Sequence, residues 1–456
     1  MDKRRKSGNT ACVPLFGKYL NKALKAAAAA AFMMTMTGCT FGTSIDNLLA
    51  PPKLSIEQEQ IYNALTDAAG DSISLKYPKA GKYLSAFIVE DIDGDGGNEA
   101  VVFYEKTGLA APENTLRINI LDRGENGKWR SVYDTPAECS EIERVMISQL
   151  GENNRINLII GSSLINRSEK TASIYSYSNG ILEKTFAESY SFIDVTDLDD
   201  DGENEFLLLQ GSVNDSPAAA IAYKLDKAGM YHRYREELSG GFTEFDAVSY
   251  GSLDSGERAL YIDAVSGNGY IQTDIVYMDK NGLQKAFDTA EQSAVTQRPS
   301  GCRSFDVDGD RLLEIPVQSV APGYDKAPEG ELMWLTNWVT VGNDGRSKLK
   351  YVSYYSVGDG YIFIFPAKWH DRVTLKRDAI NDEIVICAYE NGEIGRELMR
   401  IYYAEDAASR EDRTASGYML LRTKGESAYL ADLPPFDKTD DLAVTEAEAA
   451  IGFKFN

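Results

Sequence analysis

Histidine is nearly absent from this sequence, since only His232 and His370 occur among its 456 residues. Catalytic schemes that need a histidine base therefore have little material. His370 follows Trp369 in a strand-and-turn stretch, and His232 lies in a stretch of mixed polarity that is typical of a strand with one exposed face. Both are interpreted as surface residues rather than as catalytic bases.

Positive charge is also scarce. Lys and Arg number 47 against 70 Asp and Glu, which gives a formal charge of −23. A general nucleic-acid binder is excluded, because affinity for phosphate comes from clustered Lys and Arg. The sequence also lacks the G-x-S-x-G, H-E-x-x-H, P-loop and dinucleotide-binding patterns. We identify no catalytic site, although a pair of catalytic carboxylates cannot be recognised in so acidic a chain.

Long hydrophobic runs are missing beyond the N-terminal region. There, residues 1–38 carry seven Lys or Arg against the single acid Asp2, followed by an uncharged stretch from Ala26 to Gly38. A helix needs about 20 apolar residues to span a bilayer, and this stretch is shorter. A basic start, a short apolar run and small residues at its end predict an export signal over residues 1–38.

The signal ends in Met36-Thr37-Gly38-Cys39, which resembles the lipobox of bacterial lipoproteins. The family usually has Leu where this chain has Met36. The resemblance implies cleavage before Cys39, lipid attachment to that cysteine and a protein anchored at the outer face of the bacterial cell membrane. Residues 39–53 would then form a tether. An ordinary signal with a chance cysteine, or an uncleaved helix, is the alternative.

The remaining cysteines are too few for a disulfide scaffold. The chain has 5 cysteines without CxxC spacing, which excludes a zinc ribbon. With Cys12 removed and Cys39 lipidated, Cys139, Cys302 and Cys387 remain. Because three is an odd number, at least one thiol stays free or pairs between chains, and we expect no disulfide network.

Residues 54–83 are predicted to form a helix and a lead-in to a β-rich region. Ser55-Ile-Glu-Gln58 is a capping-box pattern that predicts a helix to about Ala68. From about Leu84 the chain changes to short apolar runs divided by Gly, Asp and Asn, which is typical of strands and turns.

An acidic nonapeptide recurs three times in this region. The segments start at Asp91, Asp197 and Asp306, each has acids at positions 1, 3, 5 and 9, and each leads into an apolar run. The first residues lie 106 and 109 positions apart, or about twice a unit of roughly 54 residues. The intervening units have lost the acids but keep the same turn-and-strand pattern.

A second set of turns has the same period. These turns are Asn126-Gly127, Asn179-Gly180, Ala228-Gly229, Asn281-Gly282 and Asp344-Gly345. Asn-Gly and Asp-Gly favour tight hairpins. Each unit therefore predicts strand, loop, strand, strand, hairpin, strand, which is typical of a propeller blade. The predicted fold class is mainly β: a β-propeller of four-stranded antiparallel blades over residues 84–356, with five clear repeats and up to seven. A β-sandwich is the alternative.

The C-terminal part, residues 357–456, is harder to assign. It contains further strand-like runs, a hairpin at Asn391-Gly392 and a helix start at Thr445-Glu-Ala-Glu. No acidic loop keeps the repeat in phase there. We predict a separate α+β domain, with a sixth and seventh blade as the alternative.

The acidic nonapeptides gather hard oxygen ligands in one small volume, which is the chemistry that Ca²⁺ prefers, since it takes 6–8 oxygens. Mg²⁺ fits less well because it demands tighter octahedral geometry. Position 7 would add a backbone carbonyl, and Gly at position 6 would allow a left-handed turn. The expected metal ligands are Asp91, Asp93, Asp95, Gly97 and Glu99 (acidic loop 1); Asp197, Asp199, Asp201, Glu203 and Glu205 (acidic loop 2); and Asp306, Asp308, Asp310, Leu312 and Glu314 (acidic loop 3).

These loops resemble the calcium loops of FG-GAP and VCBS-type repeats, the blades of integrin-α-like β-propellers. The resemblance implies structural rather than catalytic ions. It departs from the family in three ways: position 9 is Glu where the family more often has Asp, Arg311 replaces Gly in acidic loop 3, and the FG-GAP dipeptides are absent. An EF-hand is excluded, because position 12 is Val102, Leu208 or Val317 rather than Glu. A solvated acidic turn without metal is the alternative.

The resulting functional hypothesis is a lipid-anchored, calcium-stabilised β-propeller at the cell surface that binds a protein or a glycan and has no evident catalytic site. A secreted polysaccharide-acting enzyme that uses acidic residues is the first alternative. The second is a solute-binding lipoprotein, which would need two α/β lobes, whereas the middle of this chain has almost no helical periodicity.

Overall fold

The computed structural model describes residues 54–108, 116–124, 126–164, 168–214, 216–267 and 269–455. The predicted signal segment 1–38 and the tether 39–53, with Cys39, lie outside the described residues. Within the described part, no helix combines the length and the apolar character needed to cross a bilayer. The chain divides at residue 59 into two units, and the second, residues 60–456, contains the strands.

The first described element is the helix α3 (Ile56–Ala69). The predicted capping box is confirmed: the backbone N–H of Gln58 donates to Ser55 Oγ at 3.1 Å, and the backbone N–H of Ser55 donates to Gln58 Oε1 at 3.0 Å. Ile61 and Leu65, four residues apart on one face, pack against the first sheet.

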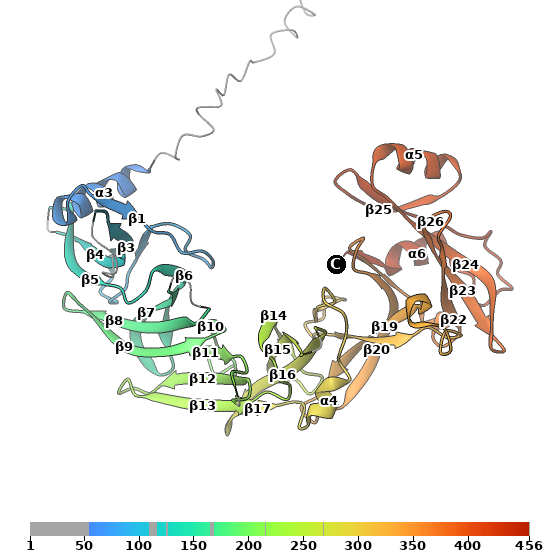
Figure 1. Ribbon diagram of the computed structural model, residues 1–456, viewed down its shortest axis with the longest axis horizontal. Coiled ribbons are helices and arrows are strands. Elements are labelled where there is room, and N and C mark those ends of the chain that lie inside the picture. Colours follow the sequence, from blue (N-terminus) through green and yellow to red (C-terminus); the bar gives the residue numbers. More distant parts are fainter. Residues whose placement is uncertain are drawn as a thin grey trace, which may run out of the picture. The chain divides into compact units, whose positions relative to one another are not determined.

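The strands form six antiparallel sheets that follow one another along the chain (Figure 1). Sheet 1 contains β1 (Ile73–Leu75), β2 (Phe87–Glu90), β3 (Glu99–Lys106), β4 (Leu116–Arg123) and β5 (Trp129–Pro136). Sheet 2 contains β6 (Glu141–Leu150), β7 (Asn153–Ser163), β8 (Lys170–Ser178) and β9 (Ile181–Tyr190). Sheet 3 contains β10 (Phe192–Thr196), β11 (Glu205–Gln210), β12 (Ala219–Leu225) and β13 (Tyr231–Glu237).

Sheet 4 contains β14 (Glu244–Ser252), β15 (Arg258–Val265), β16 (Ile271–Asp279) and β17 (Gly282–Lys285). Sheet 5 contains β18 (Ile315–Val320), β19 (Trp334–Val341), β20 (Ser347–Ser356), β21 (Tyr361–Ile364) and β27 (Phe453–Phe455). Sheet 6 contains β22 (Val373–Asp378), β23 (Glu383–Glu390), β24 (Glu393–Ala404), β25 (Met419–Lys424) and β26 (Ser427–Asp432). The remaining short elements are α4 (Ala290–Ala294), α5 (Ala407–Ala415), α6 (Glu446–Gly452) and the 3-10 turns Glu329–Glu331 and Ala367–Trp369.

The predicted β class with four-stranded antiparallel units is confirmed. The five predicted hairpin turns join β4 to β5, β8 to β9, β12 to β13, β16 to β17 and β19 to β20. The second residue of each turn is a glycine with φ between 70° and 106°, a backbone region that L-residues with a side chain rarely adopt. These glycines explain why the turn positions were readable from the sequence.

Consecutive sheets pack face to face. In β11, Leu207 and Leu209 belong to a core shared with sheet 4, whereas Phe206 and Leu208 belong to a core shared with sheet 2. Because side chains alternate between the two faces of a strand, an apolar run such as 206–209 can be buried on both sides. Similar cores join sheets 1 and 2, sheets 4 and 5, and sheets 5 and 6.

A propeller also requires its first and last blades to meet. Among the described residues, no hydrophobic core joins sheet 1 to sheet 6. Six sheets stacked in chain order are therefore established, and closure into a ring remains a prediction.

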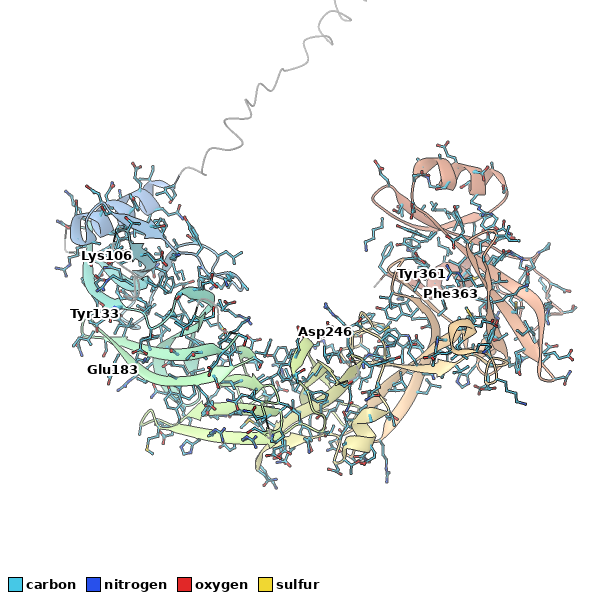
Figure 2. The ribbon with its side chains drawn as sticks, viewed as in Figure 1. Lys106, Tyr133, Glu183, Asp246, Tyr361 and Phe363 are labelled. Atoms are coloured by element: carbon cyan, nitrogen blue, oxygen red, sulfur yellow. The ribbon has the colours of Figure 1, made fainter. Side chains whose placement is uncertain are left out.

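The predicted boundary between residues 356 and 357 falls inside sheet 5. Its two sides are β20 and β21, which pair directly, with Tyr355 opposite Ile362. From β21, Tyr361 and Phe363 (Figure 2) extend into the core shared with sheet 6. The C-terminal strand β27 returns to pair with β21. The turn at Gly358-Asp-Gly360 joins β20 to β21 as a hairpin within one sheet.

A prediction for the C-terminal helix is confirmed. The helix α6 begins where the sequence predicts it, with Thr445 as its N-cap in a capping box with Glu448. Cys139, Cys302 and Cys387 are buried, and none of the three is disulfide-bonded in the structure. Burial raises the pKa of the Cys139 thiol to about 11, which makes it a poor nucleophile.

Candidate metal centres

The three acidic loops occupy equivalent places in their sheets. Acidic loop 1 connects β2 to β3, acidic loop 2 connects β10 to β11, and acidic loop 3 connects the isolated bridge at Phe305 to β18. The three loops therefore directly precede β3, β11 and β18, and none is flanked by helices. This agrees with the exclusion of an EF-hand.

Positions 1, 3 and 9 of each loop come together. One carboxylate oxygen from each residue lies within 4.8 Å of the others. The three sets are Asp91, Asp93 and Glu99; Asp197, Asp199 and Glu205; and Asp306, Asp308 and Glu314. Such a spacing of hard oxygen atoms could hold a metal ion.

The position-1 aspartate folds the loop through the backbone. In acidic loop 1, Asp91 Oδ1 accepts from the N–H of Gly94 at 2.6 Å, and Asp91 Oδ2 accepts from the N–H of Gly96 at 3.0 Å. Acidic loop 3 repeats both bonds with Asp306, although the second donor is the N–H of Arg311. Arg311 adopts a φ of 76°, so acidic loop 3 keeps the left-handed turn without glycine, at some cost in strain.

The position-9 glutamate is the buried member of each set. Its Oε2 accepts from the backbone N–H of position 2 at 2.8–2.9 Å in all three loops. The side chains of Glu99, Glu205 and Glu314 are at most 3% exposed. Burial raises the pKa of Glu99 to about 7, assisted by the charges of Asp93, Asp95 and Asp122, and burial also raises the pKa of Glu205 to about 7. These sites are strained electrostatically unless a cation is close.

Positions 5 and 7 contribute differently from the predicted pattern. Asp95 Oδ1 accepts from the backbone N–H of Gly97 at 2.7 Å, and Asp201 and Asp310 make the same contact with Glu203 and Leu312. The position-5 carboxylates are therefore part of the turn. A role for the position-7 carbonyls as ligands stays a prediction.

In acidic loops 2 and 3, a lysine from another strand lies among the carboxylates, and the sequence analysis did not predict it. Lys224 Nζ lies 3.5 Å from Asp199 Oδ2 and 3.3 Å from Glu205 Oε1, and it also contacts Asp201. Lys350 Nζ lies 2.6–2.8 Å from carboxylate oxygens of Asp308, Asp310 and Glu314. Burial opposes the ionisation of Asp308, but hydrogen bonds from Lys350 and from the Tyr351 hydroxyl lower its pKa to about 2.

Acidic loop 1 differs from the other two. In the described part of the chain, no Lys or Arg forms an ion pair with Asp91, Asp93, Asp95 or Glu99. The pKa of Asp93 is raised by burial and by the neighbouring charges of Asp95, Asp91 and Asp122. This donor set is anionic, compact and without an internal counter-ion, which fits a divalent cation.

Buried oxygens without a hydrogen-bond donor provide a second test of whether the loops suit a cation. In acidic loop 2, the buried atoms Asp199 Oδ1 and Glu205 Oε1 have no hydrogen-bond donor, although Lys224 Nζ stands at ion-pair distance from the latter. Buried polar atoms without a partner are costly. The donor chemistry therefore fits a cation in each loop, but in acidic loops 2 and 3 the ammonium group of a lysine already lies among the carboxylates.

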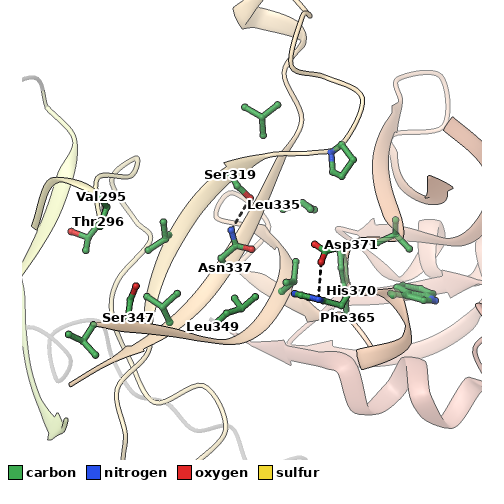
Figure 3. Close-up of a pocket in the computed structure, with 18 of the residues that line it drawn as sticks. Val295, Thr296, Ser319, Leu335, Asn337, Ser347, Leu349, Phe365, His370 and Asp371 are labelled. Carbon is green, nitrogen blue, oxygen red and sulfur yellow. Dashed lines mark hydrogen bonds and ion pairs between the residues drawn. The ribbon is translucent and has the colours of Figure 1, made fainter. Parts of the chain in front are cut away.

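Each histidine forms an exposed ion pair with one aspartate. His232 Nε2 lies 3.3 Å from Asp226 Oδ2, and His370 Nδ1 lies 3.3 Å from Asp371 Oδ2. Both side chains are about half exposed. The His370–Asp371 pair borders a cavity of about 830 Å³ over the face of sheet 5 (Figure 3). Among its described lining residues, Asp371 is the one carboxylate, so this cavity lacks the acid pair of a glycosidase.

A second cavity, of about 650 Å³, is polar and lies beside sheet 6. Five acids and four tyrosines line it: Asp359, Asp382, Glu383, Glu405, Asp406, Tyr354, Tyr361, Tyr402 and Tyr403. Glu383 is already paired with Arg400 and Arg413 at 2.9 and 3.0 Å. Asp406 caps α5 through the backbone N–H of Ser409. Asp359 Oδ2 accepts from Ser356 Oγ at 2.7 Å, and Asp382 lies 3.5 Å from Arg377. Four of these five acids thus have structural partners.

Comparison with known proteins gives no family. No protein-family model matches the sequence, and no curated protein matches it. Among solved structures, the rhamnogalacturonan lyase YesX is 13% identical with a TM-score of 0.24, covering 61% of this chain and 62% of the lyase. A Bacillus licheniformis rhamnogalacturonan lyase is 14% identical with a TM-score of 0.27, covering 71% of this chain and 61% of the lyase.

An exo-beta-1,3-galactanase from Phanerochaete chrysosporium is 13% identical with a TM-score of 0.25, covering 73% of this chain and 80% of the galactanase. The chain spans about three-fifths of the length of the two lyases. TM-scores this low do not establish a shared fold or activity.

Proposed function

We propose that this chain is a calcium-stabilised binding protein of the β-propeller type, with its sheets as blades and no catalytic role. The observation that carries the proposal is the recurrence of one acidic nonapeptide at the same place in three sheets, with its position-1, -3 and -9 oxygens converging. Ca²⁺ is the favoured ion because it accepts carboxylate oxygens in flexible geometry. It would fix the turn that orients the second strand of a blade.

Chelation tests the calcium part of the proposal. The thermal unfolding midpoint of the full chain is measured in excess EDTA and again after Ca²⁺ or Mg²⁺ is added back. We expect Ca²⁺ to raise the midpoint by several degrees and Mg²⁺ to raise it less. An identical midpoint in EDTA and in Ca²⁺ contradicts a structural calcium ion.

Ring closure is tested in solution. If sheets 1 and 6 meet, residues 60–456 form one closed compact body, for which the radius of gyration is roughly 21 Å. Small-angle X-ray scattering measures this value directly. A substantially larger radius, with all sheets still folded by circular dichroism, contradicts the propeller and leaves an open stack of sheets.

Anchoring is proposed through Cys39, on the basis of the signal-like residues 1–38 and the lipobox resemblance. The partner would be a surface protein or a glycan, and no nucleic acid is expected from a chain with a charge of −23. In a bacterial host, wild-type chain should fractionate with membranes and Cys39→Ala should not. Equal fractionation of both chains contradicts lipid anchoring. A pull-down from membranes with the mature chain would identify the partner.

One observation favours a second candidate, a polysaccharide-acting enzyme. The cavity beside sheet 6 combines acids with tyrosine rings, and aromatic faces are common platforms for sugars. Asp359→Asn and Glu405→Gln, two acids of this cavity, should then abolish cleavage of a pectic or galactan polysaccharide without changing the unfolding midpoint. Absence of cleavage by the wild-type chain contradicts this candidate.

A further inference from the structure

The cation positions of the three acidic loops can be compared through strand register. Glu99 and Glu205 are the first residues of β3 and β11, and Glu314 directly precedes β18. The residue beside each glutamate on the next strand, β4, β12 or β19, is fixed by the pairing that follows. Ala100 pairs with Leu121, Phe206 pairs with Tyr223, and Ile315 pairs with Val339. The residues beside Glu99, Glu205 and Glu314 are therefore Asp122, Lys224 and Thr340, respectively.

A β-bulge defines a second equivalent position. In sheet 5 the register between β19 and β20 shifts at Trp338/Val339, which leaves Lys350 as the extra residue between Leu349 and Tyr351. In sheet 1 the register between β4 and β5 shifts at the matching place, Ile120/Leu121, and the extra residue is Val132. In sheet 3 the register between β12 and β13 continues without such a shift.

The two lysines therefore place their ammonium groups at equivalent positions, although they come from different strands. Lys224 lies on β12, beside the buried glutamate, whereas Lys350 is the extra residue of a bulge in β20. Each ammonium lies among the carboxylates of positions 3, 5 and 9. In acidic loop 1, the corresponding residues are Asp122 and Val132, an additional acid and an apolar side chain.

We propose that Lys224 and Lys350 act as built-in cations that replace a divalent ion in acidic loops 2 and 3, so that the chain binds one such ion, in acidic loop 1. An ammonium group carries one positive charge and three N–H donors, and at 2.6–2.8 Å Lys350 neutralises the acids that a metal would otherwise hold together. A metal ion in the same volume would have to displace it. This inference rests on the proposed calcium site in acidic loop 1.

Stoichiometry tests the inference on the full chain. Ca²⁺ is titrated by isothermal calorimetry, after metal has been removed with a chelating resin. We expect one ion per wild-type chain, two per chain for Lys224→Met or Lys350→Met, and three for the double variant. Methionine keeps the length of the lysine side chain without its charge. Circular dichroism verifies that each variant is folded.

The reciprocal substitution does not depend on whether the lysine variants fold. Asp122→Lys places an ammonium beside Glu99, as Lys224 stands beside Glu205. We expect this variant to lose the single calcium ion and to unfold at the same temperature in EDTA and in Ca²⁺. Asp122→Asn, which removes the charge without supplying a cation, is the matched control and should still bind the ion.

The outcomes separate this inference from the proposed function. Two or three ions bound by the wild-type chain, or folded lysine variants that gain no ion, overturn the inference and leave the calcium proposal intact. No ion bound by the wild-type chain overturns the calcium site of acidic loop 1. Even in that case, a gain of one ion in Lys350→Met would support the proposal that Lys350 replaces a metal ion in acidic loop 3.

Discussion

The ammonium nitrogen of Lys350 lies 2.8 Å from Oε1 of Glu314, a side chain that is fully shielded from solvent. The opposite oxygen of Glu314 accepts from the backbone N–H of Val307 at 2.8 Å. Glu314, at the end of acidic loop 3, thus binds the backbone near the start of the loop. Lys350 supplies the positive charge that favours the ionised form of this buried glutamate. Lysine, loop and second strand form one electrostatic unit.

Lys350→Met should therefore destabilise the metal-free protein. Removal of one partner from a buried ion pair costs about 3–5 kcal/mol, and because Lys350 keeps 20% of its side-chain exposure, we expect about 2–3 kcal/mol. Urea unfolding in EDTA measures the change. Addition of Ca²⁺ should restore most of the loss, because the emptied loop can then accept the ion.

A double-mutant cycle isolates the pair. Glu314→Gln removes the buried charge, so Lys350→Met should cost much less in that background. Equal costs of Lys350→Met in the presence and absence of Glu314 would show that the lysine acts through packing rather than through charge.

Asp93→Asn should remove most of the calcium-dependent stability, because Asp93 is a cluster member of the loop that lacks an internal lysine. Ligand binding at a thousandfold excess over Kd stabilises a protein by about 4 kcal/mol. The difference between unfolding curves in Ca²⁺ and in EDTA should fall from this order to near zero. Glu411→Gln, an exposed acid on α5, is the control and should leave the difference unchanged.

The layout of strands and turns could be predicted because it depends on local chemistry. The hairpin glycines have positive φ, and the apolar runs after the acidic loops are buried on both faces. Each signal occupies fewer than ten consecutive residues. The same holds for Ser55 and Thr445, whose side chains cap helices that begin where the sequence indicates.

What could not be predicted depends on pairing between strands. Lys224 is 19 residues from Glu205 and Lys350 is 36 residues from Glu314, and only the register and a bulge bring them together. The boundary after residue 356 failed to appear for a similar reason, because β27 closes sheet 5 from almost 90 residues away. The helix α5 has no buried residue and so leaves no apolar periodicity to detect.

Gly251→Ala should destabilise the contact between sheets 4 and 5. A Cβ atom at Gly251 would lie 1.9 Å from Leu313 Cδ1, and Leu313 belongs to the core that joins the two sheets. Overpacking of this kind costs about 1–3 kcal/mol. Gly241→Ala is the control, since its Cβ would meet no atom within 4 Å. If thermal or urea unfolding gives equal stabilities for the two variants, Leu313 can move aside freely.

Asp274 should give the unfolding free energy a distinct pH dependence. Its side chain is fully buried on β16, where it accepts from the backbone N–H groups of Ser239 and Ile275, at 2.5 and 3.1 Å. Burial raises its pKa from 3.8 to about 6, against the opposing effects of these N–H groups and of Lys285. An acid with a raised folded-state pKa contributes stability that is complete below the unfolded-state pKa and is lost as the pH rises through the folded-state value. Wild-type protein should therefore lose about 2 kcal/mol relative to Asp274→Asn between pH 4.5 and 7.5. Urea unfolding across this range measures the difference, and parallel pH profiles for the two proteins would show that Asp274 is already ionised at pH 4.5.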